Sequence, residues 1–163
     1  MTSIKNILIA FFDDEAKEVR SVIEKVRTIP LDAKLTAETR TVLELINHIA
    51  QIPRIDVNIY SGKFPSGEDT RKTEEELNRK SVDDVLKVFD ESCQYLKTYF
   101  KDMTDDEILE KKLRPFYEPD SQLQSWDHFL SKLAAHLALH KGVLWSYLKI
   151  AKSDVNMFTY YGR

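Results

Sequence analysis

Residues 126–148 constrain the fold of this chain more than any other stretch, because their apolar residues recur every three or four positions. This spacing predicts a long amphipathic helix. His136 and His140 lie on its apolar face, one helical turn apart, where both imidazoles can reach one metal ion. The alternative is a pair of core histidines hydrogen-bonded to neighbours, and the pair alone does not decide, because His-x3-His also arises by chance. The apolar stripe consists of Trp126, Phe129, Leu133, Val143 and Tyr147, with Leu130, Leu137, Leu144 and Leu148 beside it.

The length and composition favour one helical domain that covers residues 1–163. A chain of 163 residues can bury a sizeable core without disulfides or a structural metal. It has only four glycines and five prolines but many Glu, Lys and Leu residues, a composition typical of an all-α fold. We therefore expect any bound metal to be dispensable for folding.

The charge and the single cysteine limit the expected partners and location. A formal net charge of -3 leaves no excess of cationic residues for a phosphate backbone, so we do not expect nucleic acid binding. Cys93 has no internal disulfide partner, which indicates a reducing compartment. The apolar run at residues 7–12 is short and leads directly into three acidic residues, unlike a signal peptide or a membrane span. We expect a cytoplasmic protein that does not bind membranes.

The first helix is predicted over residues 3–26, followed by a Pro-containing polar link at residues 29–40. Its inward stripe is expected to consist of Ile4, Leu8, Phe11, Val19, Val22 and Val26. The second helix begins at Thr41, which forms a capping box with Glu44. Pro53 interrupts this helix, but the apolar period continues beyond it, so we expect a kinked helix that reaches residue 60.

His48 lies on the inward row of this second helix. A single histidine on an apolar face is more often a hydrogen-bonded core residue than a metal ligand. However, three of the four histidines in the chain face inward on two helices that a small bundle would pack together. Three imidazoles that leave a coordination position open form a common site for zinc and related metals. We therefore predict that His48, His136 and His140 bind a divalent transition metal.

Residues 41–50 (TVLELINHIA) and 135–142 (AHLALHKG) also resemble the two signature helices of the DinB and YfiT-like metalloenzyme superfamily. The resemblance covers essentially the whole chain, and it implies a four-helix bundle with a long crossover between the second and third helices. It further implies nickel or zinc at His48, His136 and His140, and an activity similar to that of thiol S-transferases or a thiol-dependent isomerase. Val143 follows Gly142 where the family often has glutamine, so the catalytic branch stays open.

The remaining segments connect and complete the predicted bundle. Residues 63–80 are polar and are expected to form an exposed crossover with a helical turn near residues 73–77 and solvated charges. Ser81 starts the third helix, whose core row is expected to include Cys93 in a packing role rather than as a nucleophile. Thr104 and Glu107 form a second capping box. The loop at residues 113–119 is expected to be a packed loop or part of a pocket rim, and the apolar tail at residues 155–161 to cover the bundle end, meet a partner chain or fray.

The predicted function is that of a metal-dependent enzyme, a thiol-dependent S-transferase or a hydrolase, acting on a small molecule. A general base would be a separate residue, and the spacing does not choose among Asp56, Tyr60 and Glu15. The alternatives are a non-catalytic bundle that binds a metal or a ligand, and a helical dimerisation module. A structural zinc site is normally closed by four protein ligands, so three histidines favour a reactive site. The expected partners are a small-molecule substrate, a low-molecular-weight thiol and a second copy of the chain in a homodimer.

Overall fold

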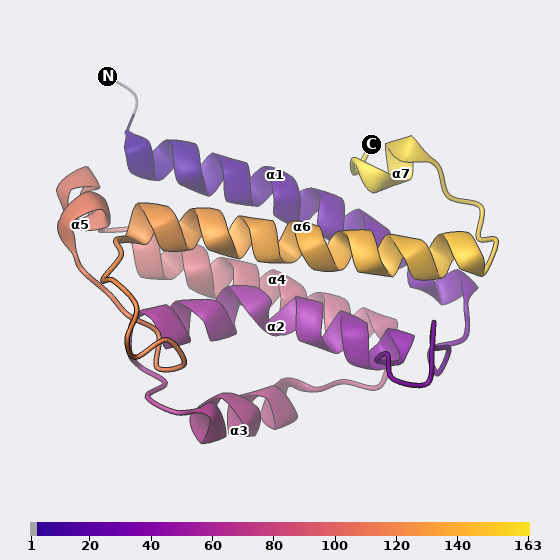
Figure 1. The fold of residues 1–163 in the computed structure, drawn as a ribbon. Helices are drawn as coiled ribbons and strands as arrows, with labels where there is room; N and C mark the ends of the chain where they lie inside the picture. Colours follow the sequence, from indigo (N-terminus) through magenta and orange to yellow (C-terminus); the bar gives the residue numbers. More distant parts are fainter. Residues whose placement is uncertain (1–2) are drawn as a thin grey trace.

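Four long helices form a bundle in the computed structural model, which describes residues 3–163 (Figure 1). They are α1 (Ile4–Lys25), α2 (Val42–Tyr60), α4 (Val82–Phe100) and α6 (Trp126–Ile150), and α1 runs parallel to α6 while α2 runs parallel to α4. Shorter elements are a 3₁₀ turn (Val26–Thr28), α3 (Gly67–Leu77), α5 (Asp105–Glu110) and α7 (Met157–Tyr160). No strand occurs in residues 3–163, which confirms the all-α prediction. None of the helices described is both long and apolar enough to cross a membrane.

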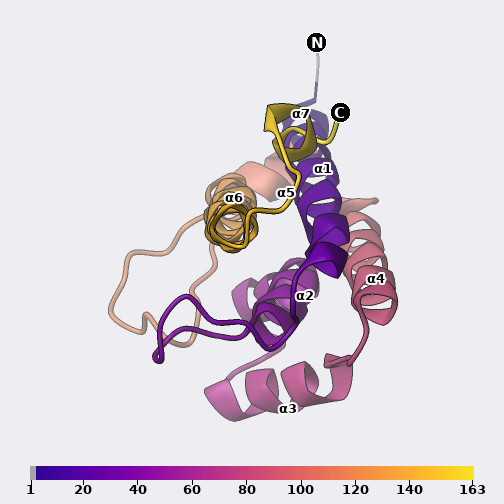
Figure 2. The same cartoon turned by 90° about the vertical axis from the view of Figure 1, so that its right-hand side faces the viewer.

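The packing of the four long helices makes α2 and α6 neighbours. Each of α1 and α2 packs against both α4 and α6, so α1 and α2 lie diagonally opposite each other across the bundle (Figure 2). The long crossover from α2 to α4 carries α3, which packs on the outer side of α2. The two helices with the predicted histidines therefore face each other.

Helix α1 begins where it was predicted, but its buried face is rotated towards Phe12. Ser3 is its N-cap and accepts a hydrogen bond from the Asn6 amide. Phe12 is fully buried, whereas Phe11 is 58% exposed and Ile4 is 38% exposed, so the expected inward stripe was wrong in the first half of this helix. Adjacent residues differ by about 100° around a helix, and the contact with α4 and α6 decides which of two neighbouring phenylalanines is buried.

Helix α2 confirms both sequence predictions about its ends. The hydroxyl of Thr41 accepts from the Glu44 amide, and the Glu44 carboxylate accepts from the Thr41 amide at 2.7 Å. The helix continues through Pro53 to Tyr60. Because α2 is one continuous helix, residues from several of its turns can line the same site.

The third predicted helix corresponds to α4, and its expected core row is buried: Val85, Phe89, Cys93, Leu96 and Phe100. The second capping box forms at Thr104 and starts the short helix α5. In the crossover, the regular structure is longer than the turn predicted at residues 73–77, because Ser66 caps a helix that spans Gly67–Leu77. This helix carries side chains onto the outer face of α2.

The C-terminal helix α7 lies against α1 (Figure 1). Tyr160 packs beside Trp145 and over the Lys141 ammonium, so the tail folds back along α1 and α6. Met157 and Phe158 stay exposed. The tail thus combines a packed side with an apolar outer side.

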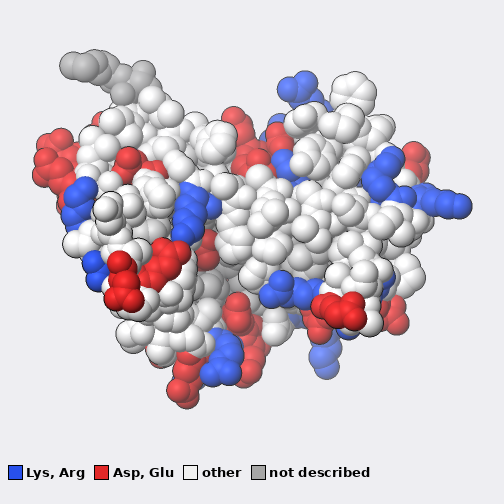
Figure 3. All heavy atoms as spheres, in the orientation of Figure 1, with Lys and Arg blue, Asp and Glu red and all other residues white. Residues whose placement is uncertain are grey.

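Charged side chains of both signs alternate along the edges of the face drawn in Figure 3, around a largely uncharged centre. Recognition of a nucleic acid backbone requires a continuous set of cationic side chains. The face shown does not present one.

Candidate metal centre

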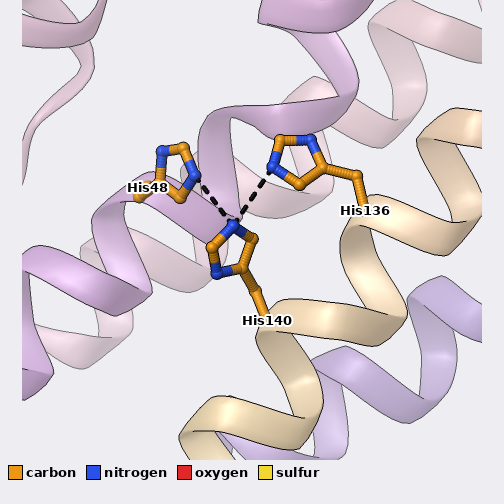
Figure 4. A group of neighbouring side chains, drawn as sticks. All are labelled: His48, His136 and His140. Carbon is orange, nitrogen blue, oxygen red and sulfur yellow. Dashed lines mark hydrogen bonds between the residues drawn. The ribbon is translucent and has the colours of Figure 1, made fainter.

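The structure brings the three predicted histidines together between α2 and α6. His48 comes from the second turn of α2, and His136 and His140 come from successive turns of α6 (Figure 4). The capping box at Thr41 sets where α2 begins and hence the direction in which His48 projects. One candidate ligand atom from each ring lies within 4.8 Å of the other two, and all three side chains are half-buried. Helix spacing supplies one pair of ligands, and helix packing supplies the third.

The distances between the ring nitrogens fit a common metal ion. The Nε2 atom of His140 lies 3.2 Å from that of His48 and 3.1 Å from that of His136. Two nitrogens that each lie about 2.0–2.1 Å from zinc at tetrahedral or octahedral angles are roughly 2.9–3.4 Å apart. A single N–H on His140 can satisfy only one of its two neighbours, so a cation suits this donor set better than hydrogen bonds do. These residues therefore fit a transition metal.

The electrostatic surroundings keep two of the three imidazoles neutral. Burial lowers the pKa of His48 to about 3, and the neighbouring imidazole of His140 and the Arg40 guanidinium act in the same direction. Burial likewise lowers the pKa of His140 to about 4, with a further contribution from the charge of His136. Neutral imidazoles bind metals, and protons compete with the metal only in acid. At neutral pH both rings are in the form that binds a metal.

Asp56 orients the third imidazole. Its Oδ2 atom lies 3.0 Å from Nδ1 of His136, and only 9% of its side chain is exposed. A carboxylate favours the tautomer in which Nδ1 carries the proton, so the lone pair of Nε2 faces the other two histidines. Asp56 was one of the three candidates for a general base, and its contact with His136 gives it a positioning role instead.

A hollow of about 510 Å³ opens beside His48 and His136. Its walls come from α2, α3, α6 and the loop before α6, and they combine four aliphatic side chains with aromatic, polar and charged ones. Tyr117 of that loop lines the hollow, so this segment does form part of a pocket rim. The other lining residues are Ile55, Asp56, Ile59, Tyr60, Thr70, Glu74, Lys132, Ala135 and Leu139. A small molecule can therefore approach the histidines from this side.

Two further side chains considered as reactive groups do not have that role in the structure. Glu15 of α1 forms an ion pair with Lys141, which is 3% exposed and also pairs with Glu18. Burial raises the pKa of the Cys93 thiol to about 12, which agrees with the predicted packing role. Neither Glu15 nor Cys93 lines the hollow.

Tyr60 remains beside the hollow, but its phenol is a poor base. Its ring stacks on Phe129 with the centroids 4.4 Å apart. Burial and the nearby Asp56 carboxylate raise its pKa well above the usual range. The Tyr60 hydroxyl is therefore a proton donor at neutral pH.

The residue that sequence reasoning missed is Glu74. It was assigned to an exposed crossover with solvated charges, whereas the structure places it half-buried along the hollow, together with His48. Burial raises its pKa, and the Arg40 guanidinium opposes this shift. The available signal was weak, because Glu74, Glu75 and Glu76 are consecutive and no apolar period singles out one of them.

Comparison with known proteins supports the fold and leaves the activity open. No protein-family model and no curated protein sequence matches this chain. A crystal structure from Exiguobacterium sibiricum, described as a candidate member of the DinB family, superposes with a TM-score of 0.70 at 19% sequence identity. The alignment covers 96% of this chain and 97% of that one. The predicted resemblance is therefore confirmed as a DinB-like fold that extends over nearly the whole chain.

Proposed function

We propose that this chain, which has a DinB-like fold, is a divalent-metal-dependent enzyme that transfers a low-molecular-weight thiol to a small electrophile. The observation that carries the proposal is the convergence of three imidazoles beside an open hollow, with Nε2 atoms 3.1 and 3.2 Å apart. Nickel or zinc suits an all-imidazole ligand set. His48, His136 and His140 would hold the ion as its protein ligands.

The ligand count supports a reactive site over a structural one. Structural zinc sites in proteins are normally closed by four protein ligands. Among residues 3–163, the cluster of potential ligands contains three histidines and no fourth side chain. When bound, a divalent metal would supply Lewis acidity and favour the deprotonated form of a thiol or water at its open side.

The surrounding residues have distinct parts in this proposal. Asp56 holds the His136 ring in the binding orientation. The apolar wall formed by Ile55, Ile59 and Leu139 would bind the body of the electrophile and exclude water. Hydrolysis of a small molecule is the second candidate function, because the same open side accepts water as readily as a thiol.

Metal analysis and spectroscopy test the proposal. Protein purified without a histidine tag should contain about one metal ion per chain, and His136→Ala should abolish this stoichiometry. His128→Ala is the matched control, since His128 is exposed on the same helix and does not belong to the cluster. In the cobalt-substituted protein, a small thiol should change the visible spectrum.

The alternative functions predict different results. A non-catalytic bundle with a closed shell would give a cobalt spectrum that does not respond to thiol, azide or pH. A dimerisation module would contain no stoichiometric metal. Either result would refute the enzyme proposal.

A further inference from the structure

The crossover helix α3 is fixed against α2 next to the candidate metal centre. The amide of Gln51, one turn after His48, donates to the carbonyl oxygen of Glu74 at 3.2 Å and to the side-chain oxygen of Asn78 at 2.9 Å. Gln51 is 2% exposed, so these hydrogen bonds are shielded from water. They set the position of Glu74 relative to His48.

Glu74 borders the space beside the histidines. Glu74 lines the large hollow together with His48 and His136, and it lines both smaller hollows that also include His48. The next two residues, Glu75 and Glu76, are exposed. Of three consecutive glutamates, α3 therefore turns one towards the candidate site.

Glu74 is available for chemistry, unlike the other acid of the hollow. Asp56 is engaged by His136, whereas the Glu74 carboxylate forms no hydrogen bond or ion pair with other residues in 3–163. A half-buried acid without a partner in a cleft is typical of functional sites. The cationic residues that line the same hollows are Lys132 and Arg40, and Lys132 pairs with Glu118.

We infer that Glu74 is the general base of this site, the residue that accepts the proton of the thiol that enters the hollow. This inference rests on the proposed function. The S–H bond of the thiol breaks, its electron pair stays on sulfur, and the proton moves to a carboxylate oxygen of Glu74. After sulfur attacks the electrophile, the protonated Glu74 returns the proton to the leaving group, so no oxidant or reductant is needed.

Burial supports this role, because it raises the pKa of Glu74. A general base is most effective when its pKa is closer to the working pH than that of an exposed carboxylate. Glu75 and Glu76 lack this burial although they belong to the same turn of α3.

Rapid mixing of a thiol with the cobalt-substituted protein tests the inference without requiring the natural substrate. The growth of the visible band after addition of 2-mercaptoethanol reports how fast the thiol loses its proton and binds. Glu74→Gln removes the base and keeps the shape of the side chain, so this rate should fall about a hundredfold, as for loss of a general base. Glu75→Gln should keep the wild-type rate, and all variants should keep one metal per chain.

Chemical rescue provides the second readout. In Glu74→Ala, added formate should restore much of the lost rate, because a small carboxylate can enter the space left by the side chain. A wild-type rate in Glu74→Gln, or an equal loss in Glu75→Gln, would overturn the inference. Loss of the metal from Glu74→Gln would also overturn it, since Glu74 would then hold the ion.

Failure of the proposed function looks different in the same experiment. If 2-mercaptoethanol leaves the spectrum of the wild-type cobalt protein unchanged, thiol transfer is refuted, and the role of Glu74 with it. If the wild type responds and Glu74→Gln responds equally fast, only the role of Glu74 is refuted.

Discussion

Replacement of Asp56 should weaken metal binding although its carboxylate is not part of the three-histidine cluster. Asp56 accepts a hydrogen bond from Nδ1 of His136 at 3.0 Å, and 9% of its side chain is exposed. Without this acceptor the ring loses its preference for the tautomer that points the Nε2 lone pair at the other two histidines. Binding of the metal must then select the correct tautomer and ring orientation.

The expected loss differs between two substitutions. Loss of such an outer partner typically costs 10- to 100-fold in metal affinity, or about 1.4–2.8 kcal/mol. Asp56→Asn keeps a neutral oxygen acceptor, so its metal affinity should fall by about tenfold. Asp56→Ala leaves the Nδ1–H of His136 without an acceptor at a largely buried position, so its metal affinity should fall by about a hundredfold.

Competition with a chromogenic chelator measures the zinc affinity of each variant. Asp102→Asn serves as the control, because this acid is exposed and distant in the sequence from the cluster. Circular dichroism would verify that each variant is folded. If both Asp56 variants bind zinc as tightly as the wild type, the hydrogen bond does not orient His136 and the reasoning fails.

Three other predictions concern stability. The metal-free protein should stay helical and unfold cooperatively by circular dichroism, since the apolar core lies along the whole bundle; unfolding upon chelation would indicate a structural metal. The metal-free protein should also lose stability in urea titrations as the pH falls from about 6.5 to 4.5, because the unfolded chain then binds protons that folded His48 and His140, with pKa values of about 3 and 4, do not; a flat profile would contradict this. Lys141→Ala should destabilise the fold by about 3 kcal/mol in the same assay, because it leaves Glu15 and Glu18 without their buried partner; an effect below about 1 kcal/mol would argue against that ion pair.

The homodimer, the cytoplasmic location and the choice of nickel or zinc stay predictions. Exposed apolar side chains on α1 and α7, among them Phe11 and Phe158, are compatible with a partner chain. Analytical ultracentrifugation would measure the oligomeric state.

Local patterns in the sequence were sufficient to predict the long helices and part of the candidate metal site. The capping boxes at Thr41 and Thr104 depend on residues three positions apart, so they could be identified before the structure. The pairing of His136 with His140 is equally local, because residues four apart share a helix face. The addition of His48 required an assumption about which helices pack together, and the contact between α2 and α6 confirms that these histidines meet.

Tertiary packing decided the features that local periodicity leaves equivalent. Phe11 and Phe12 are adjacent apolar residues, and only the approach of α4 and α6 determined that Phe12 is buried. The contact of Asp56 with His136 joins residues 80 positions apart. Similarly, Glu74 and Glu75 are adjacent and have the same side chain, but the hydrogen bonds that fix α3 on α2 place Glu74 along the hollow beside the histidines. Such choices depend on the rotation of one helix against another, which arises from contacts between distant residues and leaves no periodic pattern in the chain.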